Sequence, residues 1–218
     1  TYEWDGASFR PSAINYPNGQ RSTYSYFPNL KDQLLNQIPH LKPNTTLLSR
    51  FTYDYNAVRQ ISDWTQERAG ANPIAYHFDY DAADQLTNGV GTQNGLTVAS
   101  YAYGYDSSQN LTNESANGIL RTFTYNVLNE LTSITNDSHP TRTYEWDAEN
   151  RLVAFNQGTH RTEFTYDGLD RRTRIIEKES GVTNSVRQYV WCGTELCEER
   201  DASGTVVLKR FDALGVQV

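Results

Sequence analysis

The sequence predicts an all-β fold, a curved antiparallel sheet of stacked β-hairpins. Three observations predict it. A short aromatic motif recurs along the chain, turn signals lie between its copies, and no apolar stripe of helical spacing exceeds three turns outside residues 29–38. The chain has 218 residues, enough for one domain without metal or disulfide staples. We therefore expect a single repeat array over residues 1–218.

The motif reads aromatic-x-aromatic-Asp, with a branched apolar residue six positions after the second aromatic. Phe78-Asp79-Tyr80-Asp81 followed by Leu86 is a clear copy, and the second aromatics recur every 20 to 29 residues. Such spacing is typical of repeat architectures. The residues that carry the motif most clearly are Tyr53, Tyr55, Phe78, Tyr80, Asp81, Leu86, Tyr103, Tyr105, Asp106, Leu111, Phe123, Tyr125, Leu131, Tyr144, Trp146, Asp147, Leu152, Phe164, Tyr166, Asp167, Tyr189 and Trp191.

Several copies depart from the motif at one or two positions. An amide replaces the acid in two copies, an arginine takes the apolar slot in two others, and cysteines take both places in one. The substituted positions are Asn56 and Asn126, Arg10 and Arg172, and Cys192 and Cys197.

Each motif is expected to close a strand. Residues i and i+2 of a strand share a face, so Phe164 and Tyr166 point together while Glu163 and Thr165 point the other way. The acid that follows can accept a hydrogen bond from the backbone N–H two residues on, which starts a turn. The chain then returns with Leu86 or its equivalent lying against the aromatic pair.

A second kind of turn signal lies between the motifs. Asn-Gly between alternating residues is a strong hairpin signal, and Gln-Gly or Ser-Gly stands in the same place elsewhere. Each unit of about twenty residues therefore holds two strands. A single hairpin is marginal in water, so successive units must pair edge to edge.

Two regions break the pattern. Residues 28–43 carry Leu30, Leu34, Leu35 and Ile38 at helical spacing and are expected to form an insertion with a short helix that ends at Pro39. Residues 64–73 lack a clear motif and are expected to form an irregular loop.

Composition excludes two classes of partner. The net charge of −7 and the absence of a basic strip argue against a nucleic acid, and no apolar run is long enough to span a membrane. Because the chain contains no methionine, we expect it to be a piece of a longer polypeptide.

No catalytic, metal or cofactor site is predicted. Cys192 and Cys197 lack further metal ligands, and the sequence leaves open whether they form a disulfide or stay free thiols. The histidines His40, His77, His139 and His160 fall in separate repeats without a partner at useful spacing. A glycan hydrolase would need two converging carboxylates, whereas Glu198 and Glu199 alternate between faces. A surface of exposed rings that binds carbohydrate stays an alternative.

The repeat resembles that of the Rhs or YD-repeat family, whose units read approximately Tyr-x-Tyr-Asp-x-x-Gly-Arg/Asn-Leu. Residues 144–152 and 103–111 match closely, although Asn150 and Gln109 replace the usual glycine. Residues 189–218 resemble the stretch just before the core signature of that family. No core signature occurs before Val218, so the resemblance carries over no self-cleaving aspartate.

The resemblance implies a role in containment. In that family the repeats spiral into a hollow β-shell around a C-terminal effector, often a toxin, and related repeats in teneurins serve cell adhesion. It implies a non-enzymatic shell segment of a bacterial, secreted or cell-surface protein, with the rest of the parent polypeptide and its C-terminal cargo as partners. A carbohydrate-binding or adhesive surface is the second hypothesis. Open sheet edges predict edge-to-edge self-association of the isolated chain.

Overall fold

The computed structural model describes residues 1–136, 138–212 and 215–217. Part of the segment that resembles the stretch before the core signature, namely Ala213, Leu214 and Val218, therefore lies outside the described residues. The chain divides into two compact units, Thr1–Gly104 with Glu114–Gly118, and Tyr105–Asn113 with Ile119–Val218. We call them unit 1 and unit 2. No helix in the described part of the chain is long and apolar enough to cross a membrane.

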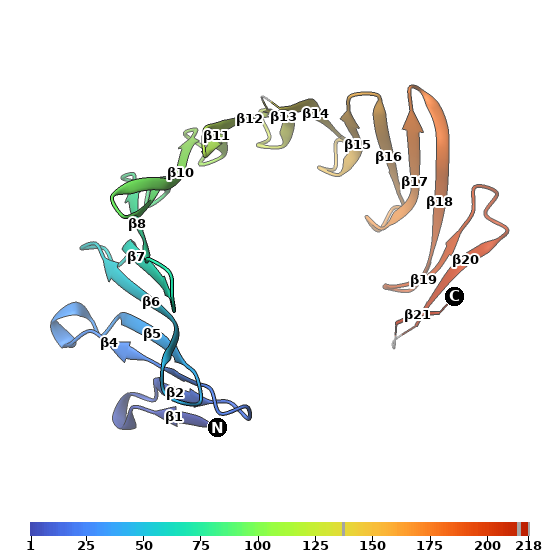
Figure 1. Ribbon diagram of the computed structural model, residues 1–218. Helices are drawn as coiled ribbons and strands as arrows, with labels where there is room; N and C mark the ends of the chain where they lie inside the picture. The colour runs from blue at the N-terminus through green and yellow to red at the C-terminus, as the bar shows by residue number, and fades with distance from the viewer. Residues whose placement is uncertain (137, 213–214, 218) are drawn as a thin grey trace. The chain divides into compact units, whose positions relative to one another are not determined.

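Unit 1 is an antiparallel sheet in which β1 pairs with β2, β2 with β3, and β3 and β4 with β5, after which the strands pair in order up to β10 (Figure 1). Two short 3-10 helices, η1 (Gly6–Ser8) and η2 (Asn29–Lys31), interrupt it. Its strands are β1 (Tyr2–Trp4), β2 (Pro11–Asn15), β3 (Arg21–Thr23), β4 (Ser25–Tyr26), β5 (Leu35–Leu41), β6 (Leu47–Tyr55), β7 (Ile61–Arg68), β8 (Ile74–Tyr80), β9 (Leu86–Gln93) and β10 (Leu96–Tyr105), whose last residue belongs to unit 2.

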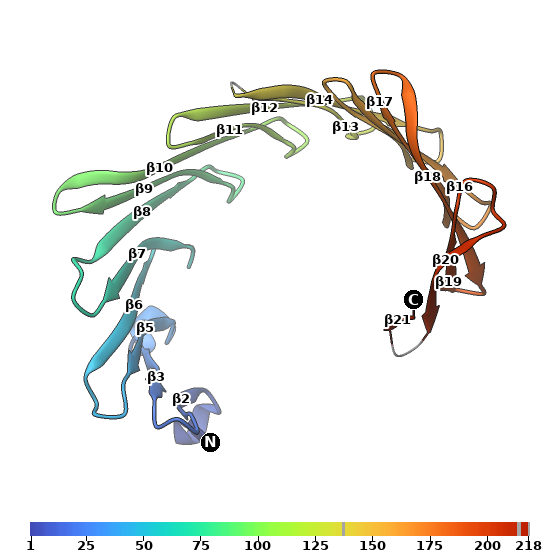
Figure 2. The same cartoon turned by 45° about the vertical axis from the view of Figure 1, so that its right-hand side comes forward.

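Unit 2 repeats the same arrangement, with each strand from β12 to β21 antiparallel to the next (Figure 2). The boundary between the units passes through β11 (Leu111–Ala116). The remaining strands are β12 (Ile119–Tyr125), β13 (Leu131–Asn136), β14 (His139–Trp146), β15 (Leu152–Gln157), β16 (His160–Tyr166), β17 (Arg172–Glu179), β18 (Val182–Cys192), β19 (Glu195–Arg200), β20 (Val207–Asp212) and β21 (Gly215–Gln217). The predicted all-β, antiparallel fold class is confirmed.

The sheets are one layer thick and have no conventional core. Among the described residues, the buried hydrophobic side chains are only Ala13, Ala99 and Ala154. The accessible surface is 13874 Å², whereas a compact monomer of this mass exposes about 10,000 Å². Because no second layer covers the rings, they are half-buried by one another and by neighbouring strands. Contacts within the layer must therefore supply the stability.

The prediction of a helical insertion at residues 28–43 is wrong. Only the single 3-10 turn η2 forms there, and both Asp32 and Gln33 adopt a positive φ of 52°, which ends it. The following residues form β5, in which Ile38 pairs with Phe51 of β6. The helical spacing of the leucines was misleading, because Pro39 cannot continue a helix and the strand gains hydrogen bonds on both sides. The segment is thus an integral part of the sheet.

The prediction of an irregular loop at residues 64–73 is also wrong for its first half. Residues up to Arg68 belong to β7, and Trp64 pairs with Tyr53 of β6 and with Tyr76 of β8. The aromatic-x-aromatic motif is absent from β7, which is why the sequence pattern missed the strand. Trp64 nevertheless alternates with polar neighbours, as a half-buried strand requires.

Candidate functional site: two ladders between repeats

In seven copies of the motif the second aromatic ties its repeat to the preceding one. The Tyr166 hydroxyl donates a 2.8 Å hydrogen bond to the backbone carbonyl of Leu152, the first residue of β15. The same bond joins Tyr26 to Pro11, Tyr55 to Leu35, Tyr80 to Ile61, Tyr125 to Leu111, Trp146 to Leu131 and Trp191 to Arg172, at 2.8 to 3.0 Å. In every case the acceptor is the first residue of a strand. We call this series the ring ladder.

The ring ladder begins where backbone pairing stops. Strands β15 and β16 pair only up to Ala154 and Glu163, and beyond that point Tyr166 reaches across to Leu152. On its other side, Tyr166 lies at a register shift against β17, as the second aromatics of most other copies do. A bulge bends the strand and disrupts the ladder, so a side-chain donor there replaces a missing backbone donor.

Burial keeps the phenol donors protonated. Desolvation raises the pKa of Tyr80 and is also the largest cause of the raised pKa of Tyr26, Tyr55 and Tyr125. A neutral phenol retains its proton, which it needs in order to donate to a carbonyl.

The acid of the motif organises the turn that follows. One oxygen of Asp81 accepts hydrogen bonds from the backbone N–H groups of Ala83, at 2.8 Å, and Gln85, at 3.0 Å. The same pair of bonds, to the residues two and four positions on, recurs at Asn56, Asp106, Asn126, Asp147 and Asp167. The amide serves as well as the acid because an Asn side-chain oxygen is an equally placed acceptor.

A second ladder joins one turn to the next, and the sequence did not reveal it. Arg151, four residues after Asp147, bonds back to that carboxylate and also donates to Asp170 of the next turn at 2.9 Å. Equivalent bonds run from Gln60 to Asp84, from Asn110 to Asn129 and from Arg171 to the Gly193 carbonyl. The signal was present in the sequence, since a polar donor stands directly before the residue in the apolar slot in each case. We call this series the turn ladder.

Charge pairing at the turns lowers the pKa of their acids. The hydrogen bond from Arg151 is the largest cause of the lowered pKa of Asp147, and that from Arg171 plays the same part for Asp167. In Asp106 the largest cause is a hydrogen bond from the uncharged Asn110. Each of these carboxylates is therefore held in its charged, accepting form.

The third residue after the acid adopts a left-handed backbone. The φ angle is 70° at Arg59, 68° at Gln109 and 59° at Asn150. Glycine occupies such positions without steric cost, which explains the glycine of the related repeat pattern. Asparagine tolerates this region better than arginine or glutamine.

The two arginines in the apolar slot both pack on rings. The Arg172 guanidinium lies 5.7 Å from the ring centre of Phe164 and 5.8 Å from that of Tyr189. Arg10 lies 4.5 Å from the ring centre of Tyr26. The planar head of each arginine thus packs on a ring of the following copy, and that of Arg172 also packs on the first ring of its own copy.

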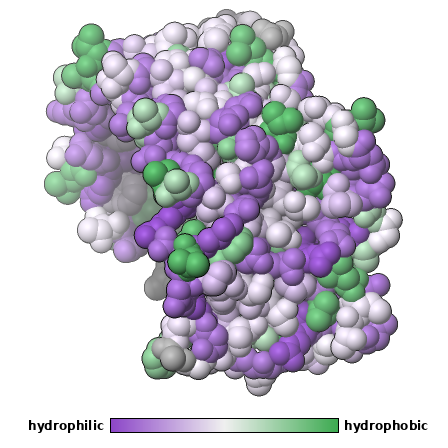
Figure 3. Space-filling model, turned by 90° about the vertical axis from the view of Figure 1, so that its left-hand side faces the viewer, coloured by the Kyte–Doolittle hydropathy of each residue, from purple (hydrophilic) through white to green (hydrophobic). Residues whose placement is uncertain are grey.

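Unit 1 carries a continuous row of stacked rings. Phe51, Trp64, Tyr76 and Phe78 follow one another with ring centres 5.3 to 6.2 Å apart and interplanar angles of at most 26°. An open cavity of about 330 Å³ adjoins this row and is lined largely by rings. Elsewhere, on the face shown in Figure 3, apolar residues form small separate patches among polar ones.

Glycines in β9 make room for this row. A Cβ atom at Gly91 would lie 2.7 Å from the Tyr76 ring, and one at Gly89 would lie 3.2 Å from the Phe78 ring. Both rings therefore lie directly over the backbone of the neighbouring strand, where they shield it from water.

The structure joins Cys192 and Cys197 in a disulfide, with their Cα atoms 5.7 Å apart. The bond crosses the turn between β18 and β19, where other repeats use the acid-centred turn. Among the described residues, no group of three or more His, Cys, Asp or Glu side chains could hold a metal ion.

The folded chain gives three histidines partners that sequence spacing did not reveal, and one of them, His160, lies 3.5 Å from Glu179. His77 lies 2.8 Å from Asp63 and 3.5 Å from Asp79 on the polar face of unit 1. His40 Nδ1 lies 2.6 Å from the hydroxyl of the fully buried Ser22. Asp63 and Ser22 come from other strands and are far away in the sequence, whereas Asp79 lies two residues from His77 in the same strand, β8.

The clustered acids near the C-terminus point to different cations. Glu198 pairs with Arg200 at 2.6 Å, while Glu199 lies 3.4 Å from Lys209. A glycosidase needs two carboxyl groups facing one cleft, an arrangement that these two residues do not form.

No protein-family model matches the sequence, and the comparison with curated proteins gives no match. The solved structures that are similar to this chain include the crystal structure of TcdB2–TccC3–Cdc42 and that of TcdB2–TccC3 without the hypervariable C-terminal region. The identity is 11% in both. The first gives a TM-score of 0.51 over 93% of this chain, and the second gives 0.50 over 94%.

The chain has an Rhs-like fold. It spans 15% of the length of each of those two chains. At 11% identity the likeness concerns the Rhs-like fold alone, so the roles given above to the ring and turn ladders rest on the hydrogen bonds of this chain.

Proposed function

We propose that this chain is a non-enzymatic wall segment of a larger protein shell, which encloses or presents a C-terminal polypeptide. The observation that carries the proposal is the combination of a one-layer sheet with two ladders of hydrogen bonds between successive repeats. A sheet with no core of its own gains stability from each added neighbour, as repeat proteins do. Such a sheet is suited to extension into a wall.

The comparisons support the same role. The chain corresponds to a small part of much longer proteins, and one of the two similar structures lacks a hypervariable C-terminal region that its parent has. By analogy, the partners of this chain would be the rest of its parent polypeptide and a cargo at the C-terminal end of that polypeptide.

Protease protection tests the proposal. The parent polypeptide is digested with trypsin, alongside the same downstream segment expressed alone and that segment mixed with the 218-residue chain. We expect protection only within the parent, because a wall shields what it surrounds. Equal cleavage rates in all three samples would refute enclosure.

A second candidate function, carbohydrate binding, is favoured by the ring row of unit 1. Apolar sugar faces stack on half-exposed rings, and the cavity beside Trp64 and Phe78 is open and mostly aromatic. A glycan array followed by calorimetric titration with any sugar that binds tests this function. A binder should lose affinity in Trp64→Ala and keep it in Trp191→Ala, whereas a wall segment should bind no sugar.

A further inference from the structure

A second pocket, in unit 2, has a chemistry unrelated to the ladders. It lies on β12, β13 and β14 beside the turn between the last two strands and has a volume of about 230 Å³. Its floor is formed by Phe123 of β12 and Ile134 of β13, which are cross-strand partners. Arg142 of β14 is the cross-strand partner of Ile134 in the next strand. Arg121 and Asn136 form the next cross-strand pair along.

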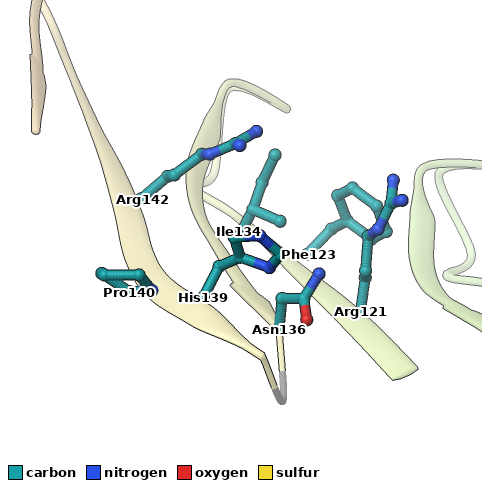
Figure 4. Close-up of a pocket in the computed structure, with 7 residues that line it drawn as sticks. All are labelled: Arg121, Phe123, Ile134, Asn136, His139, Pro140 and Arg142. Carbon is teal, nitrogen blue, oxygen red and sulfur yellow. The ribbon is translucent and has the colours of Figure 1, made fainter. Parts of the chain in front are cut away.

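The rim of this pocket is rich in hydrogen-bond donors and positive charge. Figure 4 shows Arg142 and Arg121 on either side of Ile134 and Phe123, with the His139 ring and the Asn136 amide between them. No carboxylate of a described residue lines the pocket. The chain as a whole carries a charge of −7, so this concentration of cations is local.

Arg142 differs from the arginines of the neighbouring repeats. Arg161 lies between Glu145 and Glu163, and Arg151 is held by Asp147, whereas Arg142 makes no ion pair with any residue that the structure describes. An anion beside Arg142 would give this guanidinium the ionic partner that no described residue supplies. A guanidinium presents paired N–H donors that match the two oxygens of a carboxylate.

The apolar floor restricts the class of anion. Phe123 and Ile134 are half-buried and offer ring and alkyl surface, which an inorganic anion would not use. The volume is below the range of about 300–1,000 Å³ usual for drug-sized ligands, so only a small group fits.

We propose that this pocket binds a small organic carboxylate, with the carboxylate between the two arginines and the apolar group on Phe123 and Ile134. Arg121 and Arg142 supply the charge-assisted hydrogen bonds, and His139 and Asn136 add donors at the edge. The floor strengthens these bonds because it replaces water on one side of the charges.

Titration of the full 218-residue chain with benzoate, acetate and inorganic phosphate at constant ionic strength tests the proposal, with arginine side-chain NMR signals as the readout. We expect benzoate to bind saturably and about tenfold more tightly than acetate, because its ring is removed from water on the floor. The Arg142→Gln variant should weaken benzoate binding about fivefold or more. Arg174→Gln, the same change at an exposed arginine of β17, should alter the affinity for benzoate less than about twofold.

Three results would overturn the proposal. They are no saturable shift up to about 50 mM benzoate, equal affinity for benzoate and acetate, and equal losses in the two variants. Phosphate binding as tight as benzoate binding would also overturn the carboxylate assignment. The ligands are small molecules, so the outcome is independent of whether the chain encloses a polypeptide.

Discussion

Removing one hydroxyl from the ring ladder should destabilise unit 2 measurably. In Tyr166→Phe the ring stays and only the donor to the Leu152 carbonyl is lost. A hydrogen bond of this kind contributes about 0.5–1.5 kcal/mol, and the cost lies toward the upper end when the abandoned acceptor is shielded from water. A loss of about 1 kcal/mol corresponds to a fall in Tm of about 4–8 °C for a cooperative unit of about 100 residues.

Tyr144→Phe is the matched control. Tyr144 is the first aromatic of the preceding copy; its ring packs on Phe155, and its hydroxyl makes no hydrogen bond with a described residue. The same deletion there should change the free energy of unfolding by less than about 0.5 kcal/mol. Urea and thermal unfolding followed by circular dichroism measure both variants, and hydrogen exchange shows where protection falls. Equal destabilisation by the two substitutions would refute the ring ladder as a source of stability.

Three further changes probe the turns. Gln109→Gly should stabilise the chain by about 0.5–1 kcal/mol, since glycine adopts a φ of 68° without strain, while Asn150→Gly should stabilise it less. Urea unfolding measures both variants, and equal stabilities would contradict a backbone strain at Gln109. Folding lowers the pKa of Asp167, so the stability that its carboxylate contributes is present above the ordinary pKa of aspartate and is lost as the pH falls below about 4. Asp167→Asn should keep the turn and make the stability of the chain less sensitive to acid, which unfolding midpoints between pH 2 and 7 would show. Reducing the Cys192–Cys197 disulfide should cost about 2 kcal/mol by loop closure, and an unchanged midpoint with dithiothreitol would contradict this.

The parts of the fold that depend on local pattern were predictable. Alternation around Phe164 and Tyr166 specifies a strand with two unlike faces, and Asp167 begins a turn whatever lies beyond it. The strand at Leu35–Leu41 was not predictable in this way, because its apolar residues fit helical spacing as well. Pairing with β4 and β6, a non-local contact, decides between the two.

The ladders show the same limit. The tyrosines of the motif are visible in the sequence, but their acceptors are carbonyl groups, which every residue has, so spacing alone does not identify Leu152 as the partner of Tyr166. The pairs His40 with Ser22 and Arg151 with Asp170 likewise depend on which strands become neighbours. The chemistry of a single residue can be read from the sequence. Which two distant residues come into contact depends on the register of the paired strands, which the sequence alone does not give.

The absence of a second layer makes these ladders more important than similar bonds would be in a globular domain. In a packed domain a lost hydrogen bond is one contribution beside a large hydrophobic core, but here burial within the layer is partial and each repeat contacts only its neighbours. A defect in one ladder step should therefore weaken the interface between two repeats while leaving distant repeats intact. A wall built in this way would open locally at its weakest step, and where both ladders are present the strength of a step depends on one ring donor and one turn donor.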